Sequence, residues 1–286
     1  MVGSGVICAG FAHRDCHESA SMSDTVKHRA GHPGVEPVGR GALYADLARY
    51  YDQFCAEVDY AGQCAFAARV FDAFASAGGR DYLDLACGTG QHLQAMTRLG
   101  FTPVGLDNSP AMLAQAQRRC PEARLMLCDL AGFEQEAGFD LISCFLYSIH
   151  YSHPRQQFVE TLRRTWRALK PGGVFVFNTV DAAGARQQHD VVTHVQTTDA
   201  RLTFTSGWYY AGEGEDLDLH LSIRRTSAER TQIWHDQHTM MAMTLADLKQ
   251  LLLSIGFEVT LLEHDYDRLV PWDGRSFNAI VVASRV

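Results

Sequence analysis

The sequence has no apolar run long enough to cross a membrane, and it has no long block of Lys or Arg. Its 25 Lys and Arg are outnumbered by 33 Asp and Glu, so the formal net charge is −8. A sequence-independent grip on nucleic acid needs a clustered basic surface. We therefore expect neither a membrane nor a nucleic acid as partner.

Cys-x-x-Cys pairs are also missing, although the chain has 8 cysteines. Several of them, such as Cys128 and Cys144, lie inside apolar runs, as free thiols of a reducing compartment do. Residues 1–12 lack the basic start and the unbroken apolar stretch of a secretory signal. These features predict a cytoplasmic protein.

Zinc-like ligand spacing is absent as well. The His and Cys residues near the start of the chain match no closed metal site, and they are His13, Cys16, His17, His28 and His32. We therefore predict no metal. Residues 1–40 are rich in Gly, Ser, His and Pro and show no sustained apolar period, which predicts a disordered tail ahead of one folded domain, residues 41–286.

Short apolar segments alternate with helical patterns from about residue 80 onwards, which predicts an α/β fold with a mostly parallel, doubly wound sheet. The expected strands are 82–86, 102–106, 124–128, 140–145 and 174–180. Between residues 183 and 243, Thr, Val, Trp and Tyr alternate with polar residues, which predicts an inserted antiparallel β-layer. A helix at 244–253 and a strand pair at 258–263 and 278–283 complete the domain.

The most informative stretch is Asp84-Leu85-Ala86-Cys87-Gly88-Thr89-Gly90, where an apolar strand leads into a Gly-rich turn and a helix. Ligands of doubly wound sheets bind at the carboxyl ends of the strands, and glycines let the backbone approach them closely. Asp107 ends the next strand, 17 residues after Gly90. This is about the distance expected for a carboxylate that binds ribose.

A nicotinamide enzyme would share these features, but two residues argue against it. The dinucleotide fingerprint needs a small residue at the position of Leu93. Asp84 places a carboxylate at the turn, which would repel a pyrophosphate but attract a ligand that carries an ammonium and a sulfonium group.

A third acidic residue follows the third expected strand. Asp129-Leu130 can hold an adenine edge, with the carboxylate accepting a hydrogen bond from the exocyclic amine. A single Asp at a strand end is commonly a solvated turn residue. Three of them, Asp84, Asp107 and Asp129, at successive strand ends beside a Gly-rich turn predict a binding site.

The motifs 84–90 and 128–130, together with 104–109, 139–141 and 169–173, resemble the successive motifs of class I S-adenosylmethionine-dependent methyltransferases. The resemblance covers roughly residues 41–181 and about the last forty residues. It implies S-adenosylmethionine as cofactor and a Rossmann-like seven-stranded sheet with a reversed last β-hairpin. Residues 41–286 would then form the catalytic domain, with 183–243 as an inserted lid.

The resemblance also implies cofactor contacts by position. Asp84, Ala86, Gly88 and Gly90 would line the methionine part, Asp107 would bind the ribose hydroxyls, Asn108 and Met112 would lie near the adenosine, and Asp129 and Leu130 would contact the adenine. Tyr44, Tyr51 and Phe145 are further candidates for contact with the cofactor.

Candidates for catalysis lie in the loop after the fourth expected strand. His150 can take a proton near neutral pH, and Tyr151 can orient or relay one. The pairs Tyr51-Asp52 and Asp59-Tyr60 resemble the N-methyltransferases that dimethylate deoxyaminosugar nucleotides, which implies catalytic roles for Tyr51 and Tyr151. The chain departs from that subgroup at His150, where a Gly is usual, and in the insert.

Aromatic and His residues of the insert could line the acceptor pocket, or pack in the core or at a dimer interface. They are Trp208, Tyr209, Tyr210, Trp234, His235 and His238. We predict a methyltransferase with a small-molecule acceptor, and N-methylation is slightly favoured. O- or S-methylation of a natural-product scaffold, binding of the cofactor without turnover, and a homodimer are left open.

Overall fold

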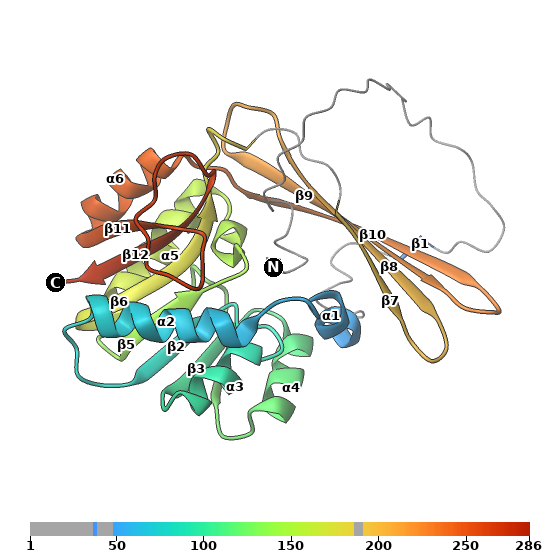
Figure 1. Cartoon of the computed structure of the whole chain (residues 1–286), viewed down its shortest axis with the longest axis horizontal. Coiled ribbons are helices and arrows are strands. Elements are labelled where there is room, and N and C mark those ends of the chain that lie inside the picture. Colours follow the sequence, from blue (N-terminus) through green and yellow to red (C-terminus); the bar gives the residue numbers. More distant parts are fainter. Residues whose placement is uncertain (1–36, 39–47, 186–190) are drawn as a thin grey trace.

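The computed structural model describes residues 37–38, 48–185 and 191–286, and within them the chain forms two β-sheets flanked by helices (Figure 1). The larger sheet has seven strands in the order β11-β12-β6-β5-β2-β3-β4. Their bounds are β2 Asp81–Leu85, β3 Thr102–Asp107, β4 Arg124–Leu127, β5 Phe139–Cys144, β6 Leu169–Val180, β11 Phe257–Glu263 and β12 Asn278–Arg285. Strands β2 to β6 run parallel, whereas β12 is antiparallel to both β6 and β11. The predicted Rossmann-like sheet with a reversed last hairpin is confirmed.

Helices cover both faces of this sheet because successive strand residues point to opposite faces and both sets are apolar. Leu83 and Phe175 pack in one cluster with α5 (Arg155–Ala168) and α6 (Leu245–Ile255). Their neighbours Tyr82 and Val174 pack in another with α2 (Tyr60–Phe74) and α3 (Gln91–Arg98). Helix α4 (Pro110–Arg119) lies beside α3 and begins with Ser109 as N-cap and Pro110 in the first turn.

The second sheet contains the predicted antiparallel β-layer. Strands β7 (Val191–Gln196), β8 (Arg201–Tyr210), β9 (Asp216–Thr226) and β10 (Thr231–Met241) pair in sequence order. One strand was not expected: β1 (Pro37–Val38) pairs parallel with β10, although it falls in the segment predicted to be a disordered tail. The rest of that segment, with the His and Cys residues near its start, lies outside the described residues.

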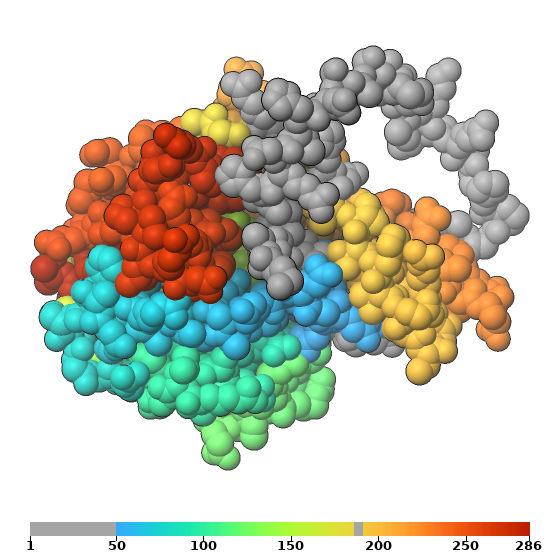
Figure 2. Space-filling model, in the orientation of Figure 1, coloured from blue at the N-terminus to red at the C-terminus, as the bar shows by residue number. Residues whose placement is uncertain are grey.

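Helix α1 (Ala48–Phe54) joins the two sheets. Phe54 stacks on Phe204 of β8 with ring centroids 4.7 Å apart, and both belong to a core that also contains Tyr147 and Trp208. Figure 2 shows α1, in blue, in contact with the strands of the β-layer, in yellow. The layer is thereby fixed beside the carboxyl ends of the parallel strands.

The Lys170-Pro171-Gly172-Gly173 motif lies at the opposite end of the larger sheet. Lys170 Nζ contacts Asp81 Oδ2 at 2.6 Å and Asp140 Oδ2 at 2.9 Å, and the Gly172 carbonyl accepts hydrogen bonds from Ser76 and Ala77. The motif therefore ties β2, β5 and β6 together where the strands begin. Strand β6 already begins at Leu169 and includes this motif, whereas the sequence predicted a strand that begins at residue 174.

Gly90 shows why one glycine of the turn is needed for packing. It is the N-cap of α3 with φ of +82°, a left-handed conformation that side chains with a Cβ rarely adopt. A Cβ at this position would lie 3.1 Å from the Cα and Cβ atoms of Ala116 in α4. The absence of a side chain therefore lets α3 and α4 approach each other.

We expect Gly90→Ala to lower the free energy of unfolding by about 1–3 kcal/mol, because it combines a left-handed alanine with a backbone clash. Urea denaturation measures this change. Gly138→Ala is the matched control, since a Cβ there would come no closer than 3.9 Å to another atom. Equal effects of the two substitutions would contradict this explanation.

Candidate active site

Two adjoining cavities lie at the carboxyl ends of β2, β3 and β4, below the β-layer. The larger has an empty volume of about 950 Å³, part of which is open to solvent. It is lined by Tyr51, Ala86, Gly88, Leu106, Asp107, Asn108, Met112, Cys128, Leu130, Leu146, Ser148, Tyr151, Trp208, Leu219, His238 and Met240. The smaller cavity shares Tyr51, Ala86, Gly88, Leu146 and Ser148 with it and extends towards Asp84.

The Gly-rich turn and Asp107 form one hydrogen-bonded unit. Ala86 and Gly88 both have positive φ, +59° and +53°. Asp107 Oδ2 accepts a hydrogen bond from the backbone N–H of Gly88 at 2.8 Å, and its Oδ1 accepts one from Ser109 at 2.8 Å. Burial raises the pKa of Asp107, while these backbone donors act in the opposite direction. The carboxylate is thus fixed at the cavity wall, where a ribose can reach it.

Asp84 lies at the end of the smaller cavity and is 1 % exposed. Its Oδ1 accepts a hydrogen bond from Ser143 at 3.2 Å, but its buried Oδ2 has no hydrogen-bond partner among the described residues. Burial raises the pKa of Asp84 to about 7. A buried carboxylate oxygen without a donor is costly, so this end of the cavity favours a cationic donor.

His92 adds a second hydrogen-bond acceptor at the Asp84 end of the smaller cavity. Its Nε2 lies 2.8 Å from Gln63 Oε1, and burial lowers its pKa to about 3, so the ring is neutral with the proton on Nε2. Nδ1 therefore presents a lone pair 3.8 Å from Asp84 Oδ2. Asp84 Oδ2 and His92 Nδ1 are thus two hydrogen-bond acceptors that face each other. Together they suit the ammonium group of an amino-acid ligand, such as the methionine part of S-adenosylmethionine.

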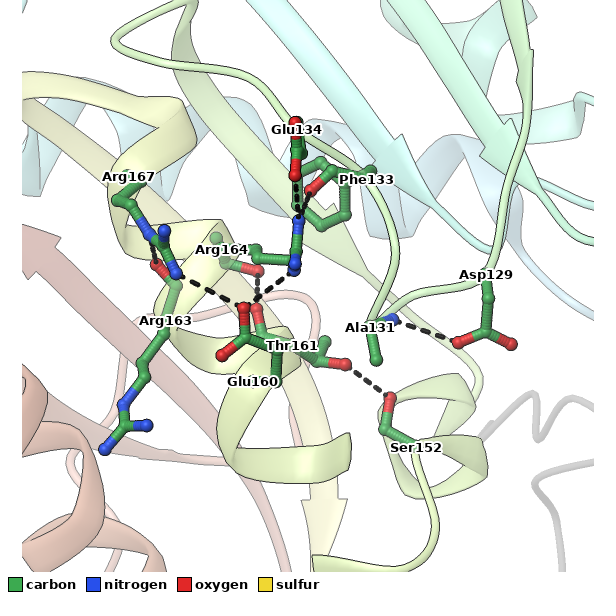
Figure 3. Close-up of polar contacts among 11 residues, drawn as sticks. Asp129, Ala131, Phe133, Glu134, Ser152, Glu160, Thr161, Arg163, Arg164 and Arg167 are labelled. Atoms are coloured by element: carbon green, nitrogen blue, oxygen red, sulfur yellow. Dashed lines mark hydrogen bonds and ion pairs between the residues drawn. The ribbon is translucent and has the colours of Figure 1, made fainter. Parts of the chain in front are cut away.

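The side of the larger cavity formed by Met112, Cys128 and Leu130 is mostly apolar. Met112 and Leu130 are buried. They line the larger cavity together with the exposed Asn108 and the partly buried Cys128. Asp129 is exposed and is not among the lining residues; its carboxylate accepts hydrogen bonds from the Ala131 N–H at 3.0 Å and from Asn108 Nδ2 at 3.4 Å. Figure 3 shows the contact between Asp129 and Ala131 in the turn after β4. The structure thus brings Asp84 and Asp107 to the cavities but leaves Asp129 at their rim.

Two of the α5 arginines shown in Figure 3, Arg164 and Arg167, are held by neighbouring groups and do not add an anion site. Arg164 donates to the Phe133 carbonyl at 2.8 Å and pairs with Glu160 at 2.8 Å, and Arg167 reaches the same Glu160 at 3.3 Å. These charges are satisfied on the helix surface.

The loop after β5 has a backbone conformation that is rare outside glycine. Leu146 and Tyr147 have φ of +58° and +59°. The backbone N–H of Tyr147 donates to Asn178 Oδ1 at 3.1 Å, and its buried ring stacks near His264, which holds the turn in place. Such strain commonly lies at functional sites. Here it presents Leu146, Ser148 and Tyr151 to the cavities.

Helix α1 covers the cofactor turn. A Cβ at Gly88 would lie 3.9 Å from the Tyr51 ring, so Tyr51 sits directly against the turn and lines both cavities. Asp52 fixes the helix there, because it accepts hydrogen bonds from Thr89 Oγ1 at 2.6 Å and from Arg119. Arg119 also donates to the Thr89 carbonyl. Phe145 lines the smaller cavity, Gly90 lines neither, and Tyr44 lies outside the described residues.

His150 requires a correction. The sequence suggested a catalytic base, but the side chain is 1 % exposed and lines neither cavity. Its Nδ1 lies 2.6 Å from the Met241 carbonyl, and its Nε2 lies 3.3 Å from the backbone N of Val180 and 3.0 Å from Thr179 Oγ1. Burial lowers the pKa of His150 to about 4. The ring links the loop after β5 to β6 and β10 and has no nitrogen left for a substrate.

The β-layer supplies the far wall of the larger cavity with Trp208, Leu219, His238 and Met240. The ring of His238 meets Tyr151 edge-on at 5.4 Å, and its Nε2 lies 3.2 Å from Asp236 Oδ2. The sequence analysis named His238 only as one of several aromatic or His residues, and it missed Asp236. The signal was their spacing of two residues in an alternating strand, which places both on one face.

Residues 83–173 match a family model described as a methyltransferase domain. The chain is 25 % identical over 185 residues to the dTDP-3-amino-3,4,6-trideoxy-alpha-D-glucopyranose N,N-dimethyltransferase of Streptomyces venezuelae, covering 63 % of this chain and 76 % of that protein. It is 27 % identical over 212 residues to the cypemycin N-terminal methyltransferase of a Streptomyces species, covering 72 % and 84 %. The sugar N-methyltransferase KedS8 from Streptoalloteichus has the same fold, with a TM-score of 0.71 and 20 % identity over 94 % of this chain and 99 % of that one.

The matched domain, the methyltransferase relatives and the shared fold support an S-adenosylmethionine-dependent methyltransferase. Within this class the chain resembles the deoxyaminosugar N,N-dimethyltransferases. The sequence-based prediction of the cofactor is thereby confirmed. Among the described residues, no group of His, Cys, Asp and Glu is arranged to hold a metal ion, and no helix is long and apolar enough to span a membrane.

We expect His150→Ala to lower the free energy of unfolding at pH 7 by about 2–4 kcal/mol, because it leaves buried backbone groups without partners. A histidine with a lowered folded pKa opposes folding as the pH falls from about 6.5 to about 4, since the unfolded chain takes up the proton first. The wild type should therefore lose stability over this range, and the variant should lose less. Urea denaturation at both pH values checks this, with exposed His194→Ala as control; equal pH slopes of variant and wild type would contradict it.

For Asp84, we expect binding of S-adenosylhomocysteine to weaken as the pH falls below about 7, because the ammonium pairs with the ionised carboxylate. Asp84→Asn should weaken binding about tenfold to a hundredfold and remove this pH dependence. Calorimetric titration measures both, and Asp72→Asn on the exposed side of α2 is the control. A pH dependence that survives in Asp84→Asn would place the ammonium elsewhere.

Proposed function

We propose that this enzyme transfers a methyl group from S-adenosylmethionine to the nitrogen of a small-molecule amine. The observation that carries the proposal is the continuity of the larger cavity. It runs from the cofactor turn at Ala86 and Gly88 to an aromatic wall formed by Tyr51, Tyr151 and Trp208. One cavity can therefore hold the cofactor at one end and an acceptor at the other.

The chemistry of the wall favours an amine. Among the residues that line the larger cavity, Asp107 is the one carboxylate, and none is Lys or Arg. Faces of Tyr and Trp rings attract cations, and they leave a neutral amine free to react once its proton is lost. The lining offers no Lys or Arg to hold a carboxylate as the methylated group.

Bound S-adenosylmethionine supplies an electrophilic methyl group on a sulfonium, whose charge is lost as the methyl moves. In our proposal, Asp84 and His92 hold the ammonium, Asp107 accepts hydrogen bonds from the ribose hydroxyls, and Met112 and Leu130 pack on the adenine. Tyr51 and Tyr151 orient the acceptor and exclude water. Alignment in a dry pocket then supplies much of the rate acceleration.

The names of two relatives indicate which acceptors to test first. The Streptomyces venezuelae relative is an N,N-dimethyltransferase of a dTDP-linked amino sugar, and the cypemycin enzyme is an N-terminal methyltransferase. Both names describe methylation at nitrogen. We therefore propose dTDP-linked amino sugars as the first acceptors to test, followed by peptide amines and free amines.

We further propose that the enzyme works in the cytoplasm. The six cysteines in the described ranges are free, and five of them are buried. Thiols packed in this way suit a reducing compartment.

The test is a panel of amines, phenols, thiols and carboxylates incubated with the full chain and methyl-labelled S-adenosylmethionine, with products read by mass spectrometry. We expect amines to be methylated and Tyr151→Phe to lower kcat about tenfold or more without changing the Kd of S-adenosylhomocysteine. Tyr209→Phe, on the β-layer but outside both cavities, is the control. Methylation at oxygen or sulfur alone would overturn N-methylation, and binding without any product would favour a non-catalytic role.

A further inference from the structure

We propose that His238 is the proton acceptor for the substrate amine and that Asp236 is its positioning residue. The proposal rests on the N-methylation proposed above. It assigns a catalytic residue to the β-layer, in place of the loop residue His150 that the sequence suggested.

Asp236 and His238 stand out because the inner face of the β-layer is otherwise mostly apolar. Alternate residues of β8, β9 and β10 face the core, and nearly all of them are apolar. They include Leu202, Phe204, Trp208, Leu217, Leu219, Leu221, Ile223, Trp234 and Met240. Asp236 is 8 % exposed on this face, between Trp234 and His238. A carboxylate in such surroundings costs free energy unless it serves a partner.

The geometry gives the two side chains different roles. Asp236 Oδ2 lies 3.2 Å from Nε2 of His238, and Asp236 Oδ1 accepts a hydrogen bond from the backbone N–H of Gln237 at 3.1 Å. A carboxylate at this distance favours the tautomer with the proton on Nε2, which leaves the lone pair on Nδ1. Asp236 therefore orients the imidazole ring of His238, as the carboxylate of a catalytic triad orients its histidine.

His238 is placed where an acceptor would bind. It lines the larger cavity together with Tyr51, Tyr151 and Trp208, and its ring meets Tyr151 edge-on. Burial lowers the pKa of His238, and Asp236 opposes this shift. The imidazole is therefore neutral at pH 7 and can take a proton. His150, by contrast, has both nitrogens bonded within the fold.

In the proposed reaction, proton transfer to His238 precedes methyl transfer to the nitrogen. An ammonium substrate gives one proton to His238, which becomes an imidazolium, and the freed nitrogen lone pair forms the bond to the methyl carbon. The carbon–sulfur bond breaks with its electron pair on sulfur, so the sulfonium becomes a neutral thioether and the product amine carries the positive charge. The imidazolium then loses its proton to solvent through the open side of the cavity.

Other titratable groups share this space, and the test must separate them. Asp236 lies on the same strand, while Tyr151, Tyr51, Asp107 and Cys128 come from the 3₁₀ turn Ser148–Tyr151, from α1 and from the ends of β3 and β4. A pH profile of the wild type alone would not distinguish them from His238.

The first measurement is NMR of the full chain with isotope-labelled histidines, with His238 assigned by comparison with His238→Gln. We expect His238 to be neutral at pH 7 with its proton on Nε2. Asp236→Asn should lower the pKa of His238 and mix the tautomers, because the carboxylate that raises the pKa is gone. A protonated His238 at pH 7, or a proton on Nδ1 in the wild type, overturns the proposal without any acceptor being known.

The second measurement is kcat against pH, with the dTDP-linked amino sugar or other amine that the wild type methylates best. His238→Gln should lower kcat about a hundredfold to ten-thousandfold and remove the rise of kcat with pH, while the Kd of S-adenosylhomocysteine stays unchanged. Asp236→Asn should retain part of kcat and shift the rise to lower pH. His235→Ala, on the same strand but on its exposed face, should behave as wild type.

A kcat within twofold of wild type for folded His238→Gln overturns the proposal. If the wild type methylates no amine, N-methylation itself has failed. The tautomer and pKa of His238 then still decide whether the dyad exists, so the two failures are distinguishable.

Discussion

The carboxylate of Asp107 connects the two loops on which the cofactor site depends. Its two oxygens accept hydrogen bonds from Gly88, in the turn after β2, and from Ser109, at the start of α4. This bridge ties the turn and the N-terminus of α4 to each other at the cavity wall. The same carboxylate is buried and its pKa is raised, so it is held in place by donors and not by a cation. Tyr51 and the helix α1 in turn take their position from this turn, through Asp52, Thr89 and Arg119.

Charge is distributed unevenly between the two ends of the cavities. The methionine end has an orphan carboxylate oxygen of Asp84 and a lone pair of His92, and both attract a cation. The acceptor end has aromatic rings and a neutral imidazole. A ligand with a permanent ammonium is therefore held at one end. A cation at the other end meets aromatic rings and the imidazole of His238, to which it can lose its proton in our proposal.

Much of the larger sheet could be predicted, because its strands are apolar and short and end in Gly-rich or Asp-containing turns. The same reasoning placed Asp84, Gly88, Asp107 and Leu130 at one edge, and the family resemblance added Ala86 and Met112; all six line the cavities. It failed where the direction of a side chain is set by distant contacts. His150 follows a strained turn that rotates it into the core, towards Met241 of β10, which is 91 residues away in the chain. Gly90 is required by its left-handed conformation and by its approach to Ala116, and no local pattern shows the second of these. His238 and Asp236 share one face of the predicted β-layer, but the sequence did not show that the even-numbered residues of β10 point inwards.

The two sheets share no strand in the described part of the chain, although both line one cavity. In our proposal, contacts to the cofactor come from the loops of the larger sheet, whereas the wall facing the acceptor comes largely from the β-layer. Substitutions on the inner face of that layer can therefore reshape the acceptor pocket while the hydrogen bonds around Asp107 stay intact. This separation makes a change of acceptor accessible to evolution in small steps, because each step leaves the methyl donor bound as before.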